Sequence, residues 1–246
     1  MRAFDREVVD AVWEAIEALL PVPPGDAHPL GCHRPRVPDR LCFEGILIRL
    51  VTGCAWVDAE ALLDGAVSDT TLRARRDEWI EAGVFDALVD EAIAAYDRIV
   101  GLDFSECSVD GSQHKAPTGG DGTGPNPVDR GRSGWKWSLF ADRNGIPVGW
   151  TAAGANRNVR HLVAAVGITD LVCSRLRPRG TATAKKLVPL GMRWPIERTN
   201  SWLSNFGQLR RNTDRRPAHR LAQIALAIVL LLTAKLIDWR NRWSPT

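Results

Sequence analysis

A short stretch around Asp110 has the residue types of a metal-dependent active site. Phe104, Cys107 and Val109 favour a short buried strand that ends at Asp110, and Gly111 allows the backbone to turn sharply after the acid. A carboxylate at the end of a strand, next to a glycine-rich loop, is a suitable ligand for a hard divalent cation. The alternative is an ordinary Asp-Gly hairpin turn with a solvated carboxylate.

A second stretch with possible chemistry surrounds Glu197. Pro195 is typical of the first turn of a helix, where its missing N–H removes no hydrogen bond. Glu197 then lies in that first turn, where the helix dipole favours a negative charge, and Arg193 lies four residues before it. Glu197 could be a simple ion-pair partner or a metal ligand kept ionised by its basic neighbours.

The charge of the chain is unevenly distributed. The 246 residues carry a formal net charge of +3, but residues 1–100 hold 10 basic and 19 acidic side chains, whereas residues 101–246 hold 22 and 10. A strongly basic second half indicates a polyanion, and nucleic acid in particular, as partner. The five scattered cysteines match neither a disulfide framework nor a zinc site, which predicts a reducing cytoplasmic location.

The first hundred residues show the periodicity of helices. Amphipathic or apolar patterns predict helices over 4–20, 41–51, 57–63, from Ser68 or Asp69 onward, and over 84–99, with a proline-rich linker over 21–40. The third and fourth of these helices could form a helix-turn-helix that presents Arg73, Arg75 and Arg76 to a DNA groove. An ordinary helical bundle with solvated arginines is the alternative.

The second half alternates between strands and helices. The turn residues 142–145 separate predicted strands over 135–141 and 146–153, and a helix over 156–166 precedes a short strand over 168–173. The apolar run 221–237 is at the lower limit for a membrane span and contains Lys235, so we expect a helix buried in the protein core and no membrane partner.

Three segments resemble bacterial insertion-sequence transposases of the DDE class: 110–117 (DGSQHKAP), 124–136 (GPNPVDRGRSGWK) and 193–202 (RWPIERTNSW). The resemblance implies an α/β fold, an RNase H-like mixed sheet flanked by helices over 101–246, preceded by a mainly helical domain over 1–100. It also implies Asp110 as the first catalytic Asp, Glu197 as the terminal Glu and Arg193 as the Arg that precedes it, with Mg²⁺ or Mn²⁺ bound by the acids.

The reaction implied is phosphoryl transfer on double-stranded DNA, both at the transposon ends and at the target. The residues expected to hold backbone phosphates are Lys115, Arg130, Arg198, Arg210 and Arg211. A homodimer and association with the nucleoid are further expectations.

One part of the family pattern has no counterpart here. The second Asp is expected at the end of a further strand, but only Gly167 separates the predicted helix from the predicted strand 168–173, which indicates an internal deletion between 166 and 168. Asp170 is the nearest acid, yet it lies near the start of its strand. The sequence therefore leaves two functions open: a transposase, and a catalytically inactive DNA-binding protein that recognises element ends or inhibits transposition.

Overall fold

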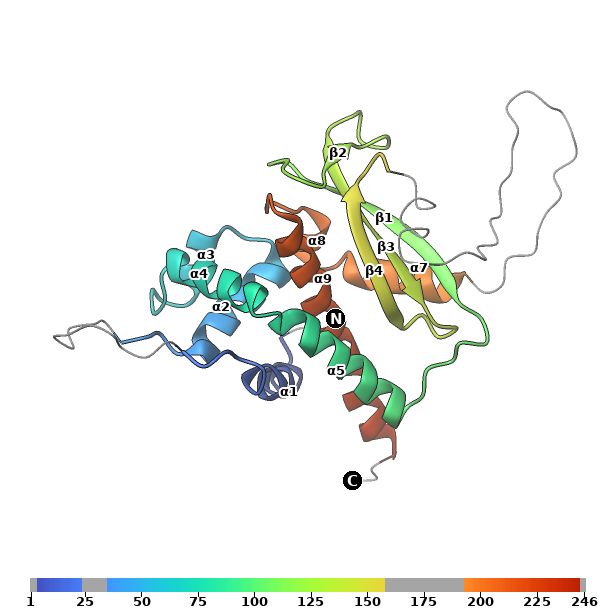
Figure 1. Cartoon of the computed structure of the whole chain (residues 1–246), viewed down its shortest axis with the longest axis horizontal. Coiled ribbons are helices and arrows are strands. Elements are labelled where there is room, and N and C mark those ends of the chain that lie inside the picture. Colours follow the sequence, from blue (N-terminus) through green and yellow to red (C-terminus); the bar gives the residue numbers. More distant parts are fainter. Residues whose placement is uncertain (1–3, 24–34, 158–192, 244–246) are drawn as a thin grey trace, which may run out of the picture.

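The computed structural model describes residues 4–23, 35–157 and 193–243 (Figure 1). A group of helices on one side and an antiparallel sheet on the other are joined by the long C-terminal helix α9, which runs between them. The elements in chain order are α1 (Arg6–Glu17), α2 (Asp39–Thr52), α3 (Trp56–Leu62), α4 (Asp69–Glu81), α5 (Val84–Ile99), β1 (Ser108–Lys115), β2 (Gly124–Pro125), β3 (Ser133–Ala141), β4 (Pro147–Gly154), α7 (Trp194–Leu203), α8 (Gly207–Arg210) and α9 (Pro217–Trp243).

The five N-terminal helices begin and end near the predicted positions. The Asp5 carboxylate accepts a hydrogen bond from the backbone N–H of Glu7 at the start of α1, and Ser68 caps α4 through Thr71 in the same way. Gly53 ends α2 in the left-handed conformation, with φ of 75°. The helical prediction for this half is therefore confirmed, although the boundary of a separate domain at residue 100 stays a prediction.

Helix α9 supplies much of the core, because apolar side chains cover most of its circumference from Ala222 to Leu232. It packs against α5, α1 and α4 on the helical side and against β4 and α7 on the sheet side. By length and composition alone, α9 is the one helix among the described residues that could cross a membrane. However, 61% of its most apolar 18-residue stretch is buried inside the protein. The expectation of a buried helix is confirmed, and its physical reason is that neighbouring helices cover it.

The sheet is built around β3. Strand β1 pairs with one edge of β3, and β4 and the short β2 pair with the other edge, all antiparallel. The predicted hairpin is confirmed, since Gly145 adopts φ of 78° between β3 and β4. The predicted helix 156–166 and strand 168–173 lie almost entirely outside the described residues. The structure thus gives an α/β fold with an antiparallel sheet flanked by helices, and the RNase H-like mixed sheet stays a prediction.

The prediction for the strand that carries Asp110 was wrong at both ends. Strand β1 begins at Ser108 and continues through Asp110 and Gly111 to Lys115, so the acid lies within the strand and no turn follows it. Asp110 lies opposite Leu139, and Gly111 lies opposite Ser138 on β3. Pairing with a full-length partner strand outweighed the local turn preference of Asp-Gly, because every paired backbone group gains a hydrogen bond.

Two of the three α4 arginines predicted to read DNA are buried, whereas Arg73 is exposed and pairs with Asp69. Arg75 and Arg76 are only 5% and 7% exposed. Arg75 pairs with Asp39 and Glu78, and Arg76 pairs with Asp77 and Asp214. The alternative of solvated arginines is equally wrong for these two residues, since both are held inside by acids that sequence periodicity could not locate.

Candidate active site

Asp110 and Glu197 lie beside the same guanidinium group. Arg193 Nη2 is 3.9 Å from Asp110 Oδ1 and 3.4 Å from Glu197 Oε1. Because these two distances add to 7.3 Å, the two carboxylate oxygens cannot be farther apart than that. The side chains of Arg193 and Glu197 are about half exposed and that of Asp110 is 29% exposed, so water screens these ion pairs and leaves the carboxylates accessible. Residues 83 positions or more apart in the chain are thus brought together.

Helix α7 holds Glu197 in place because its first turn docks on the β3–β4 turn. The Thr199 hydroxyl donates to the backbone carbonyls of Gly145, at 2.5 Å, and Pro195, at 3.1 Å. A side chain at Gly145 would bring its Cβ within 2.5 Å of the Pro195 carbonyl oxygen, so the close approach of helix and turn requires glycine. Pro195 lies in the first turn of the helix as predicted.

Asn200 is a site residue that sequence reasoning missed. Its Nδ2 donates to Asp110 Oδ2 at 3.0 Å, and its Oδ1 accepts a hydrogen bond from Trp137 Nε1 at 2.8 Å. Asn200 lies three residues after Glu197, which places both on the same side of α7. That spacing was the signal in the sequence that could have identified it.

The donor set at this site fits one divalent cation. Mg²⁺ is commonly bound through one or two carboxylates with water and substrate phosphates as the remaining ligands, and Asp110 and Glu197 supply two carboxylates. Among the described residues there is no group of three or more His, Cys, Asp or Glu side chains that could hold a metal ion. Asp170, the weak candidate for a third acid, lies outside the described residues.

Three of the predicted phosphate-binding residues share one surface depression. Lys115 at the end of β1 and Arg210 and Arg211 at the end of α8 line a cavity of about 430 Å³, together with Gln113, His114, Asn126, Val128 and Asp129. The Lys115 carbonyl accepts a hydrogen bond from the backbone N–H of Asn212 at 2.9 Å, which fixes the two segments side by side. Lys115 and Arg211 also line an adjacent depression with Arg132. We refer to Lys115, Arg132, Arg210 and Arg211 as the basic surface.

The other two predicted phosphate-binding residues lie elsewhere. Arg130 is exposed in the loop between β2 and β3 with φ of 53°, and it does not line the basic surface. The Arg198 guanidinium lies 4.6 Å from the ring centroids of both Trp194 and Trp202, and its Nη2 donates to the Asn144 carbonyl at 3.0 Å. Arg198 therefore links α7 to the β3–β4 turn.

A second carboxylate–arginine cluster lies in the protein interior, around Asp214 just before α9. Asp214 is 3.1 Å from Arg76 Nη1 and 3.5 Å from Arg49 Nη2, and it accepts hydrogen bonds from Gln208 and Gln223. Burial alone would raise the pKa of Asp214, but Arg49 and Arg76 oppose this, and the pKa is lowered overall. Every oxygen of this carboxylate is therefore occupied by donors from the protein.

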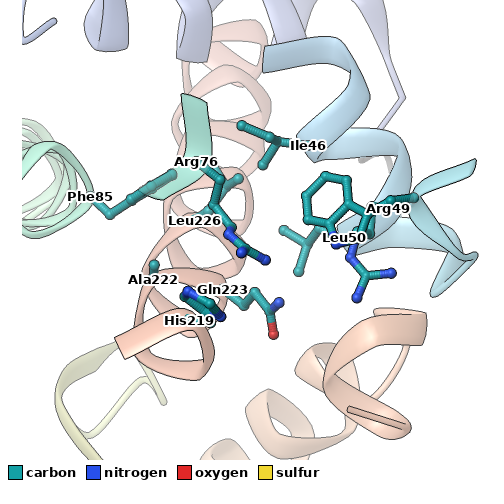
Figure 2. Close-up of a pocket in the computed structure, with 10 residues that line it drawn as sticks. Ile46, Arg49, Leu50, Arg76, Phe85, His219, Ala222, Gln223 and Leu226 are labelled. Carbon is teal, nitrogen blue, oxygen red and sulfur yellow. The ribbon is translucent and has the colours of Figure 1, made fainter. Parts of the chain in front are cut away.

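The cavity beside this cluster is small (Figure 2). Arg49, Arg76, His219 and Gln223 surround a volume of about 20 Å³, enough for about one water molecule. Burial lowers the pKa of His219, whose Nε2 is 3.0 Å from Asp77. The cluster joins α2 and α4 to the start of α9, and its cavity is too small for a ligand much larger than water.

Comparison with known proteins places the chain in a family. Residues 8–89 match a family model described as "Putative transposase of IS4/5 family". An insertion element IS402 uncharacterized 16.2 kDa protein of Burkholderia cepacia is 36% identical over 118 residues, which are 48% of this chain and 79% of that protein.

A second similar protein of Burkholderia cepacia is named "Putative transposase for insertion sequence element IS402". It is 28% identical over 133 residues, and the match covers 38% of this chain and 60% of that protein, which is less than two thirds of its length. No solved structure matches the chain significantly. Since 79% of the first relative is covered at 36% identity, the chain belongs to the insertion-sequence transposase family.

Proposed function

We propose that this chain acts on DNA as a DDE-class transposase whose active site is assembled around Asp110 and Glu197. The observation that supports this most directly is the shared contact of both carboxylates with Arg193, because two separate family motifs meet there. The interior cluster at Asp214 is the contrasting case, since its carboxylate is saturated by protein donors and has no oxygen left for a ligand.

Asp110 and Glu197 would hold one Mg²⁺ or Mn²⁺ ion through their carboxylate oxygens. A cation bound there polarises phosphoryl oxygens and lowers the pKa of a bound water. Arg193 would offset the charge of the two acids in the absence of the cation, and it is exposed enough to turn toward a DNA phosphate.

The DNA path would run over the basic surface. Lys115 is the last residue of the strand that carries Asp110, so a backbone held at Lys115, Arg210 and Arg211 passes the end of the catalytic strand. Asp129 lies in the same depression and lowers its net positive charge. Phosphates would therefore be held there mainly by direct hydrogen bonds from the arginines, and less by long-range attraction. A homodimer on two element ends stays a prediction.

A second function, DNA binding without strand transfer, is favoured by the small number of acids at the site. The described residues supply two carboxylates, and in-line phosphoryl transfer with two cations needs more. The alignment with this second IS402 protein is 133 positions long, but it covers only 38% of the 246 residues of this chain, which is about 93. About 40 positions of the alignment are therefore gaps in this chain. This difference supports an internally shortened chain.

The decisive experiment separates the two functions with one substrate. The full chain is incubated with a duplex that carries the ends of its own element, in Mg²⁺ and in Mn²⁺, and both binding and cleavage are measured. An active transposase would bind and cleave this duplex, whereas the inactive alternative would give salt-sensitive binding with little or no cleavage. Cleavage that is lost in both Asp110→Ala and Asp170→Ala would establish an active three-acid transposase and overturn the inactive alternative. Absence of any binding to duplex DNA would overturn both.

A further inference from the structure

The Asn200 side chain bridges two strands of the sheet under the candidate active site. It is buried, and its amide lies between the indole of Trp137 on β3 and the carboxylate of Asp110 on β1. The contacts of 2.8 Å and 3.0 Å are both within the normal range for hydrogen bonds. None of the sequence motifs assigns a role to this residue.

The indole fixes which way the amide points. A tryptophan N–H can only donate, so the amide oxygen must face Trp137, and the amide NH₂ group must then face Asp110. The anchor itself cannot move, because Trp137 is fully buried, paired with strands on both sides, and stacked on His114 with ring centroids 3.8 Å apart. A rigid donor thus points at Asp110 Oδ2.

With Oδ2 held by Asn200, the second oxygen of Asp110 lies on the side of the half-exposed Arg193. Oδ1 is the atom that lies toward Arg193, which also contacts Glu197. We propose that Asn200 is the positioning residue of this site: it locks the Asp110 carboxylate so that Oδ1 is presented toward Glu197 for a shared divalent cation. This inference rests on the proposed function of the Asp110–Glu197 pair.

A purely structural role for Asn200 is the competing explanation, and the adjacent residue supplies a matched control. Thr199 is also buried in α7, and its hydroxyl donates to the backbone carbonyls of Gly145 and Pro195 and not to Asp110. Thr199→Val therefore removes a buried hydrogen-bonding group from the same helix turn. Any loss that follows merely from weakening α7 should appear in both Thr199→Val and Asn200→Leu.

The test measures binding of Mn²⁺ to the full chain by titration calorimetry and by electron paramagnetic resonance, so no catalytic activity is needed. Loss of a residue that orients a metal ligand typically lowers metal affinity 10- to 100-fold. We expect Asn200→Leu to weaken Mn²⁺ binding at least about tenfold, and clearly more than Thr199→Val, which weakens the docking of α7 but leaves the hydrogen bond to Asp110 in place. Equal affinities in these two variants would overturn the positioning role.

A second measurement decides the matter if Asn200→Leu fails to fold. Trp137→Phe leaves Asn200 in place but removes the N–H that fixes its amide, and we expect Mn²⁺ binding to weaken in this variant as well. In the wild-type chain the indole N–H signal of Trp137, identified by its absence from Trp137→Phe, should shift when Mg²⁺ is added. An unchanged Mn²⁺ affinity in Trp137→Phe, or no shift of that signal at saturating Mg²⁺, would contradict the inference.

Failure of the inference can be distinguished from failure of the proposed site. If wild-type and Asp110→Ala chains bind Mn²⁺ equally or not at all, the Asp110–Glu197 pair is no metal site, and both proposals are overturned. If Asp110→Ala abolishes binding while Asn200→Leu does not weaken it, the metal site stands and only the positioning role is rejected.

Discussion

Asp110 and Asp214 both lie beside arginines, yet their surroundings make two different kinds of site. Asp214 is buried between Arg49 and Arg76, with two glutamines donating to the same carboxylate. Asp110 has one firm donor, Asn200, and a distant, exposed arginine at 3.9 Å. A saturated carboxylate stabilises the fold, whereas a carboxylate with one oxygen left open can bind a ligand. The number of donors, and not the presence of arginine, separates the two.

The largest effect expected from this difference is on stability. Asp214→Ala removes the acid shared by the buried Arg49 and Arg76 and leaves Arg76 paired with Asp77, so we expect a loss of roughly 3–5 kcal/mol in the free energy of unfolding. Asp110→Ala removes one hydrogen bond at a partly exposed position and should cost about 1 kcal/mol. Urea unfolding of both variants and of the wild type measures this. Similar losses at the two positions would show that the clusters do not differ in the way proposed.

A pH titration sharpens the comparison, because the two regions respond to acid in different ranges. His114, on the same face of β1 as Asp110, is 7% exposed, and burial lowers its pKa to about 4. Since the unfolded value is about 6.5, the unfolded chain binds the proton more readily, and stability falls as the pH drops from about 6.5 to 4 by up to about 3 kcal/mol. The lowered pKa of Asp214 acts in a more acidic range. The stability that this group contributes is present above about pH 3.9 and is lost only as the pH falls further.

His114→Phe tests this assignment, because a phenyl ring can keep the stacking on Trp137 and cannot take up a proton. We expect the fall in stability between pH 7 and 4.5 to become much smaller in this variant, as measured by urea unfolding at both pH values. His219, whose pKa is also lowered by burial, should contribute to the dependence that remains. An unchanged pH dependence in His114→Phe would assign the whole effect to other groups.

A metal titration tests the open site directly. Glu197→Gln keeps the size of the side chain but removes its charge, so Mn²⁺ affinity should fall at least about tenfold. Asp214→Asn, which alters only the interior cluster, should leave the affinity of the folded chain unchanged. Equal Mn²⁺ affinity in wild type and Glu197→Gln would exclude Glu197 as a ligand.

The smallest expected effects concern individual phosphate contacts. A plot of log K against log salt concentration falls for binding to duplex DNA. Replacing Lys115, Arg210 or Arg211 by alanine should each make that fall less steep by about 0.9. Arg98→Ala is the matched control, because Arg98 is an exposed arginine in the last turn of α5, within the acidic first hundred residues. A slope that falls as much in Arg98→Ala as in the basic-surface variants would mean that DNA does not follow the proposed path.

The sequence predicted the elements whose signals are local. The cap at Ser68, the hairpin turn at 142–145 and the proline at the start of α7 each depend on the backbone of a few neighbouring residues. For the same reason it identified the two motifs that contain Asp110 and Glu197. Their proximity was expected from the family resemblance, since no local rule relates residues so far apart.

Tertiary structure decided what depends on distant partners. Gly111 is extended because β3 pairs with it, Arg75 and Arg76 are buried because acids from other segments neutralise them, and Asn200 faces Asp110 because an indole on β3 sets the direction of its amide. The physical reason is common to all three cases. Hydrogen bonds and ion pairs between distant segments gain enough free energy to override local preference, and only the folded chain brings these partners together.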